Sequence, residues 1–129
     1  MLELTIIKRG VFMIGTCLCE KIEVKLEKKK NKVGACYCGM CRKWADGALY
    51  YIWKPYLEGD FGLEGKDNIN EYVSSEKAKR GFCKNCGTSL YYKLTSGEFF
   101  FNAGLFSDYD SDFELIKEYD VEQKPRYIK

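Results

Sequence analysis

The amino-acid sequence predicts a small, mostly β protein in which helix is limited to short turns. Apolar and polar residues alternate with a period of two in several short runs, as they do in half-buried strands. Twelve glycines separate these runs, and nowhere do apolar residues recur at helical spacing over three turns. A chain of 129 residues fits one domain, which can bury a hydrophobic core without covalent cross-links.

The first clear strand signal is the alternation of Ile22, Val24 and Leu26 with charged residues. The lysine-rich run 28–32 follows, and we interpret it as a solvated turn rather than a nucleic-acid-binding patch. Residues 33–38 can then return beside the first strand, so the sequence predicts a hairpin here.

The middle of the chain carries two further strand signals. A dense apolar and aromatic run at 48–53 predicts a strand that Pro55 brings to an end. A weaker strand is expected at 71–73. The best helical candidates are single turns near 54–58 and 75–79.

The C-terminal third predicts one hairpin and one last strand. Residues 89–95 and 98–103 flank Ser96–Gly97, a dipeptide typical of a tight hairpin turn. Residues 113–119 form the last strand candidate. The acidic run 108–112 resembles the opening of a calcium loop but lacks its glycine and final glutamate, so a solvated turn is expected.

Charge and hydropathy narrow the class of protein. Lys and Arg total 21 and Asp and Glu total 19, so the net charge is +2, which argues against a nucleic-acid-binding protein. No run approaches the roughly 18 apolar residues of a membrane span, so no membrane partner is expected. The stretch 2–14 is broken by charges and does not resemble a secretory signal. We therefore expect a cytoplasmic protein with reduced thiols.

The patterned sequence begins close to Met13. We therefore expect residues 13–129 to form the single domain. Residues 1–12 would then be an N-terminal extension, either natural or left by cloning.

The strongest chemical signal is the clustering of the seven cysteines. They fall into Cys17-x-Cys19, Cys36-x-Cys38-x-x-Cys41 and Cys83-x-x-Cys86. An odd number of tightly clustered cysteines in a cytoplasmic chain indicates zinc ligands rather than disulfides. A redox Cys-x-x-Cys pair would need a strand followed by a helix, a context that we do not expect for either motif.

Each spacing suits a tetrahedral ion. Residues two apart on a strand share a face, and leaning side chains can bring their sulfurs within about 4 Å. A Cys-x-x-Cys turn does the same, with Gly39 or Gly87 permitting the tight backbone. Seven ligands suffice for one closed four-sulfur site and one three-sulfur site with an open position. Spacing alone does not assign the ligands to the two sites, because it also permits Cys36 and Cys38 to join Cys17 and Cys19.

The three clusters, in this order, resemble the glutathione-dependent formaldehyde-activating enzyme (GFA) family. The resemblance spans about residues 13–128 and rests on three stretches, which are Gly15–Cys19, Cys36–Lys43 and Arg80–Thr88, with Gly104–Leu105 also fitting. It implies a β-rich, Mss4-like fold with two zinc ions. It also implies a structural site of Cys17, Cys19, Cys83 and Cys86, and an open, catalytic site of Cys36, Cys38 and Cys41. Tyr37 stands where the family commonly has histidine.

The resemblance further implies a carbon–sulfur lyase that adds glutathione, or a similar small thiol, to formaldehyde. Three thiolates and Zn²⁺ carry a net charge of −1, which suits holding an incoming thiol as thiolate. Arg42, Lys43 and Arg80 adjoin the cysteine clusters and are the candidates to bind glutathione's carboxylates. The three-cysteine site lacks a fourth protein thiol, so we expect it to lose zinc more readily during purification.

Two points stay open from the sequence. The aromatic residues Trp44, Tyr50, Tyr51 and Trp53 could wall a pocket, although packing in the core is the simpler expectation. The chain has no histidine to act as a base, so a non-catalytic, zinc-stabilised binding module is the alternative function.

Overall fold

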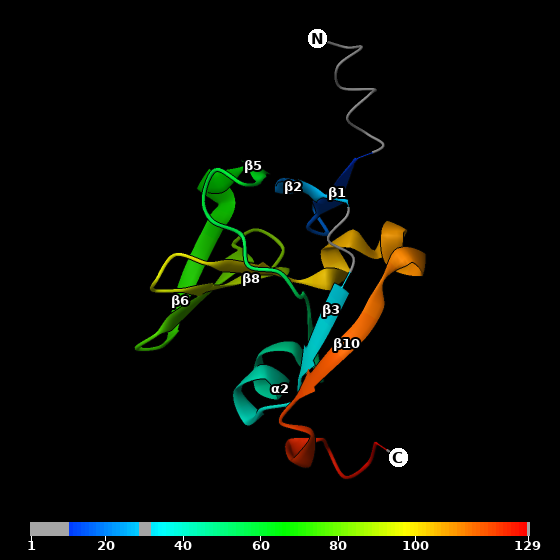
Figure 1. The fold of residues 1–129 in the computed structure, drawn as a ribbon. Helices are drawn as coiled ribbons and strands as arrows, with labels where there is room; N and C mark the ends of the chain where they lie inside the picture. The colour runs from blue at the N-terminus through cyan, green and yellow to red at the C-terminus, as the bar shows by residue number, and fades with distance from the viewer. Residues whose placement is uncertain (1–10, 29–31, 129) are drawn as a thin grey trace.

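The computed structural model describes residues 11–28 and 32–128, and it is mostly β as the sequence predicts. Its strands form three small sheets (Figure 1). No helix in these two stretches is long and apolar enough to cross a membrane. Residues 1–10, which make up most of the predicted extension, lie outside the described residues.

The first sheet has the antiparallel order β1-β2-β5, formed by Phe12–Thr16, Glu23–Glu27 and Gly62–Glu64. The alternation in β2 is confirmed, because Val24 and Leu26 are fully buried. β1 was not predicted. Its Gly15 lies so close to the carbonyl oxygen of Leu105 that an added Cβ would stand 2.6 Å away, so glycine is required there.

The second sheet has the order β10-β3-β4, formed by Glu114–Tyr119, Lys32–Cys36 and Leu49–Ile52. The strands predicted at 48–53 and 113–119 are confirmed, but the hairpin between residues 22–27 and 33–38 is wrong. Both edges of β2 are already paired, so β3 instead pairs with β4 and, in parallel, with β10. The run 28–32 lies largely outside the described residues.

The third sheet is the antiparallel meander β6-β7-β8-β9, formed by Ile69–Ser75, Ala78–Cys83, Ser89–Leu94 and Phe99–Phe101. The hairpin predicted around Ser96–Gly97 is confirmed, with Gly97 at a φ of +109°.

Both predicted helical turns are wrong. Ser75 pairs with Ala78, so the short polar segment between them turns the chain from β6 into β7. Residues 54–58 are not helical, because Tyr56 exchanges two backbone hydrogen bonds with Phe99.

The helical elements are short, as expected. They comprise α2 (Gly39–Ala45) and the 3₁₀ segments η1 (Lys66–Asn68), η2 (Ala103–Asp112) and η3 (Val121–Gln123). The acidic side chains of 108–112 lie in the last part of η2 and are exposed. α2 was missed because its two turns are too short to show a helical period.

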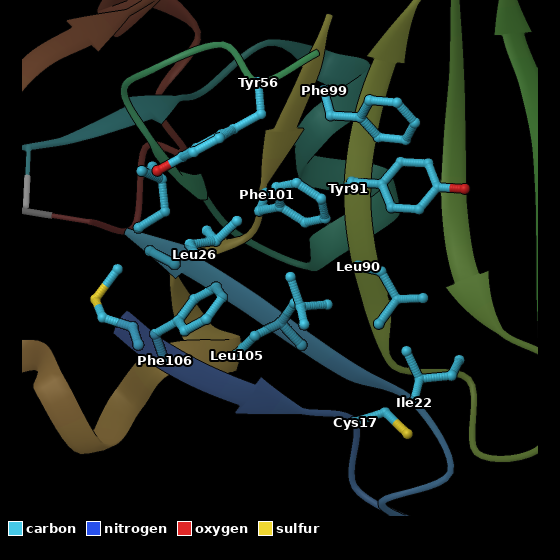
Figure 2. Close-up of a cluster of buried hydrophobic side chains, with 14 of the residues drawn as sticks. Cys17, Ile22, Leu26, Tyr56, Leu90, Tyr91, Phe99, Phe101, Leu105 and Phe106 are labelled. Carbon is cyan, nitrogen blue, oxygen red and sulfur yellow. The ribbon is translucent and has the colours of Figure 1, made fainter. Parts of the chain in front are cut away.

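The core lies between the first and third sheets and is rich in aromatic rings (Figure 2). Tyr91 meets Phe99 edge-on at a centroid distance of 4.9 Å, and Phe99 stacks on Phe101 at 5.8 Å. Figure 2 shows Cys17 at one end of this cluster, close to Ile22. The core therefore reaches directly to one of the cysteine clusters.

Candidate metal centres

The structure gathers the seven cysteines into two separate groups. The four-cysteine group contains Cys17, Cys19, Cys83 and Cys86, and the three-cysteine group contains Cys36, Cys38 and Cys41. Within each group all sulfur atoms lie within 4.8 Å of one another. All seven side chains are free thiols. This arrangement separates Cys36 and Cys38 from Cys17 and Cys19, a point that spacing alone had left open.

Two tight turns build the four-cysteine group. Cys17 and Cys19 lie in the turn that follows β1, rather than on a strand as predicted, and Glu20 completes this turn at a φ of 64°. Cys83 ends β7, and the chain turns back at Gly87, whose φ is +81°. The N–H of Cys17 donates to the Ile22 carbonyl at 3.2 Å, which closes the first turn.

The spacing of these sulfurs fits a tetrahedral zinc ion. Zinc–sulfur bonds near 2.3 Å place neighbouring sulfurs about 3.8 Å apart. The Sγ atoms of Cys17 and Cys19 are 3.6 Å apart, and those of Cys19 and Cys83 are 3.8 Å apart. Four thiols are also the donor set that structural zinc prefers. This group can therefore hold zinc with no position left open.

The local environment sets different proton affinities within the four-cysteine group. Burial raises the pKa of Cys17 to about 11. Hydrogen bonds to the Thr88 hydroxyl and backbone lower the pKa of Cys86 to about 5. The group thus combines one thiol anchored in the core with one that readily becomes the thiolate a metal requires.

A strand end and a helix start build the three-cysteine group. Cys36 ends β3, Cys38 is the N-cap of α2, and Cys41 lies in the first turn of that helix. The N–H of Cys41 donates to the Sγ of Cys38 at 3.3 Å. This is the strand-then-helix context that the sequence was expected to lack. The nearby Sγ of Cys36 makes a third ligand, which distinguishes the group from a two-cysteine redox pair.

A cavity of about 500 Å³ opens onto these three sulfurs. Its walls are largely aromatic, and the lining residues besides the cysteines are Met40, Leu49, Tyr51, Trp53, Ser75, Arg80, Tyr92, Phe100, Tyr119 and Asp120. Tyr51 and Trp53 thus line the cavity, so the expectation that they pack in the core is wrong. Trp44 packs elsewhere, stacking on Tyr72 and donating to Ser89.

Arg80 is the one cation among the described residues that line this cavity. Its side chain is only 3% exposed, and one of its N–H groups donates to the Sγ of Cys41 at 3.5 Å. The guanidinium carbon also lies 5.0 Å from the ring centre of Tyr92 and 5.9 Å from that of Trp44. Its Nε and Nη1 have no hydrogen-bond partner among the described residues.

Arg80 also affects the pKa of Cys41. Burial raises the pKa of that thiol, and the hydrogen bond from Arg80 opposes the rise. Since a buried cation with unused donors favours an anion, the cavity is built to accept negative charge beside the sulfurs.

Arg42 and Lys43 lie elsewhere. They line a separate hollow of about 260 Å³ with Gly39, Asp46, Gly47, Pro125 and Tyr127. The structure therefore brings Arg80, but not these two cations, to the three-cysteine group.

A third and larger hollow, of about 820 Å³, lies beside Cys17 and Leu18. The charged residues that line it are Glu20 and Asp108, both acidic. None of the described residues that line this hollow is a cation that could bind an anionic ligand.

Sequence reasoning missed Tyr92, Tyr119 and Asp120 as cavity residues. Asp120 places its Oδ2 3.7 Å from the Sγ of Cys36. The available signal was their position, because Tyr119 ends the last predicted strand and Asp120 follows it, but nothing indicated that this strand pairs with β3. Tyr37, by contrast, donates to Glu118 at 3.0 Å, which raises its pKa to about 12.

Comparisons with known proteins agree with this arrangement. The family model for "glutathione-dependent formaldehyde-activating enzyme" matches residues 12–119. A Schizosaccharomyces pombe protein named "uncharacterized lyase" is 38% identical over a 97-residue alignment that covers 71% of this chain. The match spans 66% of that relative, just under two thirds of its length.

A solved structure of a Rhodobacter sphaeroides protein has the same fold, with a TM-score of 0.58 and 24% identity. The match covers 72% of this chain and 86% of the other. At this identity the likeness shows the fold alone.

Proposed function

The chain belongs to the glutathione-dependent formaldehyde-activating enzyme family, and from that premise we propose that it is a zinc-dependent carbon–sulfur lyase. It joins a small thiol, with glutathione as the first candidate, to formaldehyde or a similar aldehyde, and it catalyses the reverse reaction. The single observation that carries this proposal is the convergence of three thiols and the buried Arg80 guanidinium on one cavity.

The charges of this cavity favour an incoming thiol. Zinc bound to the three cysteines would supply a Lewis acid that keeps the substrate sulfur as a thiolate. Three cysteine thiolates, a divalent ion and the Asp120 carboxylate carry a net charge of −2, and Arg80 reduces it to −1. The guanidinium therefore weakens the repulsion that an incoming anionic sulfur meets.

The proposed reaction needs no redox partner. The thiolate sulfur attacks the carbonyl carbon, a carbon–sulfur bond forms, and the π electrons of the carbonyl move to its oxygen. The proton that left the thiol ends on this oxygen, which completes the hydroxymethyl thioether. Reversal returns the aldehyde and the thiol.

Residues of this chain can stabilise the oxygen that gains charge. Tyr51 and Tyr92 line the cavity, and burial raises the pKa of both phenols. They therefore stay protonated near neutral pH and can donate a hydrogen bond. The guanidinium of Arg80, which lines the same cavity, offers a second anchor, either for this oxygen or for a carboxylate of the thiol.

Arg80 is the first choice among the three cations for a substrate carboxylate. Arg42 and Lys43 line a different hollow, so they would contact only the far end of a thiol that extends out of the cavity.

The free thiols that the reaction requires suit a reducing compartment such as the cytoplasm.

The experiment that tests this function measures exchange between glutathione and its formaldehyde adduct by NMR, because the two also react without a catalyst. Zinc-loaded protein should accelerate the exchange above the spontaneous rate, and the variant Cys41→Ser should not. If fully zinc-loaded protein leaves the exchange at the spontaneous rate, the non-catalytic binding module becomes the better account.

A further inference from the structure

Among the described residues that line the cavity of the three-cysteine group, Asp120 is the one carboxylate. β10 runs parallel to β3, and their register pairs Tyr119 with Cys36 (Figure 1). Asp120 is the next residue, and its Oδ2 accepts a hydrogen bond from the Sγ of Cys36 over 3.7 Å. It also lines the cavity that opens onto the three sulfurs.

Hydrogen bonds hold the backbone that carries this carboxylate in place. Asp120 has a φ of 56° and a ψ of 43°, a left-handed conformation that Asp and Asn tolerate better than most residues. Its carbonyl accepts the N–H of Gln123 at 2.9 Å. The side chain of Gln123 in turn accepts the N–H of Gly39, also at 2.9 Å, at the start of α2. On the other side, Tyr119 accepts the N–H of Tyr37 at 3.0 Å.

The hydrogen bond from Cys36 to Asp120 would be lost when a metal binds. A cysteine that ligates zinc is a thiolate and has no proton to donate. Two anions would then face each other across 3.7 Å. A shared cation removes this conflict, because sulfur at about 2.3 Å and carboxylate oxygen at about 2.0 Å from tetrahedral zinc lie about 3.5 Å apart.

We propose that Asp120 is the fourth ligand of the metal ion held by Cys36, Cys38 and Cys41, and that an incoming thiol displaces it. The set of atoms lying within 4.8 Å of one another comprises the three sulfurs alone, so the exposed Asp120 side chain rotates inward to bind. Because zinc takes either carboxylate or thiolate as a fourth ligand, a thiol can replace this ligand without disturbing the other three. The displacement step rests on the proposed function, whereas the metal ligation does not.

Two variants of the full chain test this assignment. Asp120→Asn keeps the left-handed backbone and the size of the side chain while it removes the anionic donor. Glu122→Gln is the matched control, since it removes the same charge from the same exposed turn away from the cysteines. The readouts are the affinity of the three-cysteine site for Co²⁺, from competition with a chelator, and the glutathione affinity of the cobalt-loaded site, from its thiolate-to-metal absorption.

Asp120→Asn should weaken cobalt binding at this site by at least about 10-fold and should tighten glutathione binding, because no anionic ligand remains to be displaced. Glu122→Gln should change neither value. If Asp120→Asn weakens both affinities, its role is structural, and if it changes neither, Asp120 is not a ligand. A wild-type protein that binds no thiol would overturn the displacement step and the proposed function, while the cobalt affinities still decide the ligation.

Discussion

The two cysteine groups share one type of side chain but differ in their surroundings. The four-cysteine group is closed by two tight turns and joined to the core through Cys17 and Cys83, which are 2% and 0% exposed. The three-cysteine group forms where β3 ends and α2 begins, and it faces a cavity that holds a buried cation. The two groups therefore differ in their surroundings as well as in their number of thiols, a difference that fits the proposed division into a structural and a reactive centre.

The largest effect should come from Cys86→Ser. A structural zinc site supplies an apparent free energy of about 10–16 kcal/mol in small zinc-binding peptides, against a net domain stability of about 5–15 kcal/mol. This zinc would also tie two turns together, since Cys19 and Cys83 are 64 positions apart. We expect an unfolded or insoluble protein, as measured by circular dichroism. A folded variant with a cooperative melt would show that the four-cysteine group is dispensable.

Cys41→Ser should act on the metal without unfolding the chain. The three-cysteine group contributes one buried side chain, Cys41, and this residue lies outside the main core cluster. We expect a folded protein that keeps one zinc ion instead of two, as measured by elemental analysis. If this variant unfolds as readily as Cys86→Ser, both groups are structural and the distinction between them fails.

Arg80→Met should weaken thiol binding while the metal content stays at two ions. The variant keeps much of the side-chain bulk but removes the charge, and charge-assisted hydrogen bonds contribute about 1.5–3 kcal/mol. We expect glutathione affinity to fall by about 10- to 100-fold in a calorimetric titration. Arg42→Met is the matched control, because Arg42 lines the separate hollow. Equal losses of glutathione affinity in the two variants would contradict the proposal that Arg80 is the principal anion-binding residue.

Tyr37→Phe should have the smallest effect. The variant removes the hydrogen bond from the Tyr37 hydroxyl to Glu118, which contributes about 1 kcal/mol to the free energy of unfolding. Metal content and thiol binding should not change, because the bonded hydroxyl is directed to Glu118. Urea denaturation checks the stability, and a variant that loses its second zinc ion would place Tyr37 at the metal site.

The sequence pattern predicted the local strands and the hairpin around Gly97, but not the pairing of strands that lie far apart in the chain. Local patterns in neighbouring residues were enough to predict the burial of Val24 and Leu26 and the turn at Gly97. The parallel pairing of β10 with β3 joins segments about eighty residues apart, and no local pattern encodes it. For this reason Asp120 could not be placed beside Cys36 from local sequence patterns.

The cysteine clusters were the most informative part of the sequence. Their spacing indicated metal ligands, and the family resemblance implied the same two groups that the structure brings together. The role of Arg80 could be suspected from its position near Cys83, but its burial against Cys41 depends on the pairing of β7 with its neighbours. Arg42 and Lys43 show the limit of such reasoning, because adjacency to a cysteine in sequence did not place them in its cavity.

The most direct test of the account uses protein loaded with Co²⁺ at both sites and titrated anaerobically with glutathione. We expect the absorption of one cobalt ion per chain to change as a new thiolate binds, while the other ion, in the four-cysteine group, keeps its spectrum throughout. The Cys41→Ser variant should show only the unresponsive ion. If both ions respond to glutathione, or if neither does, the division into one closed and one open centre is contradicted.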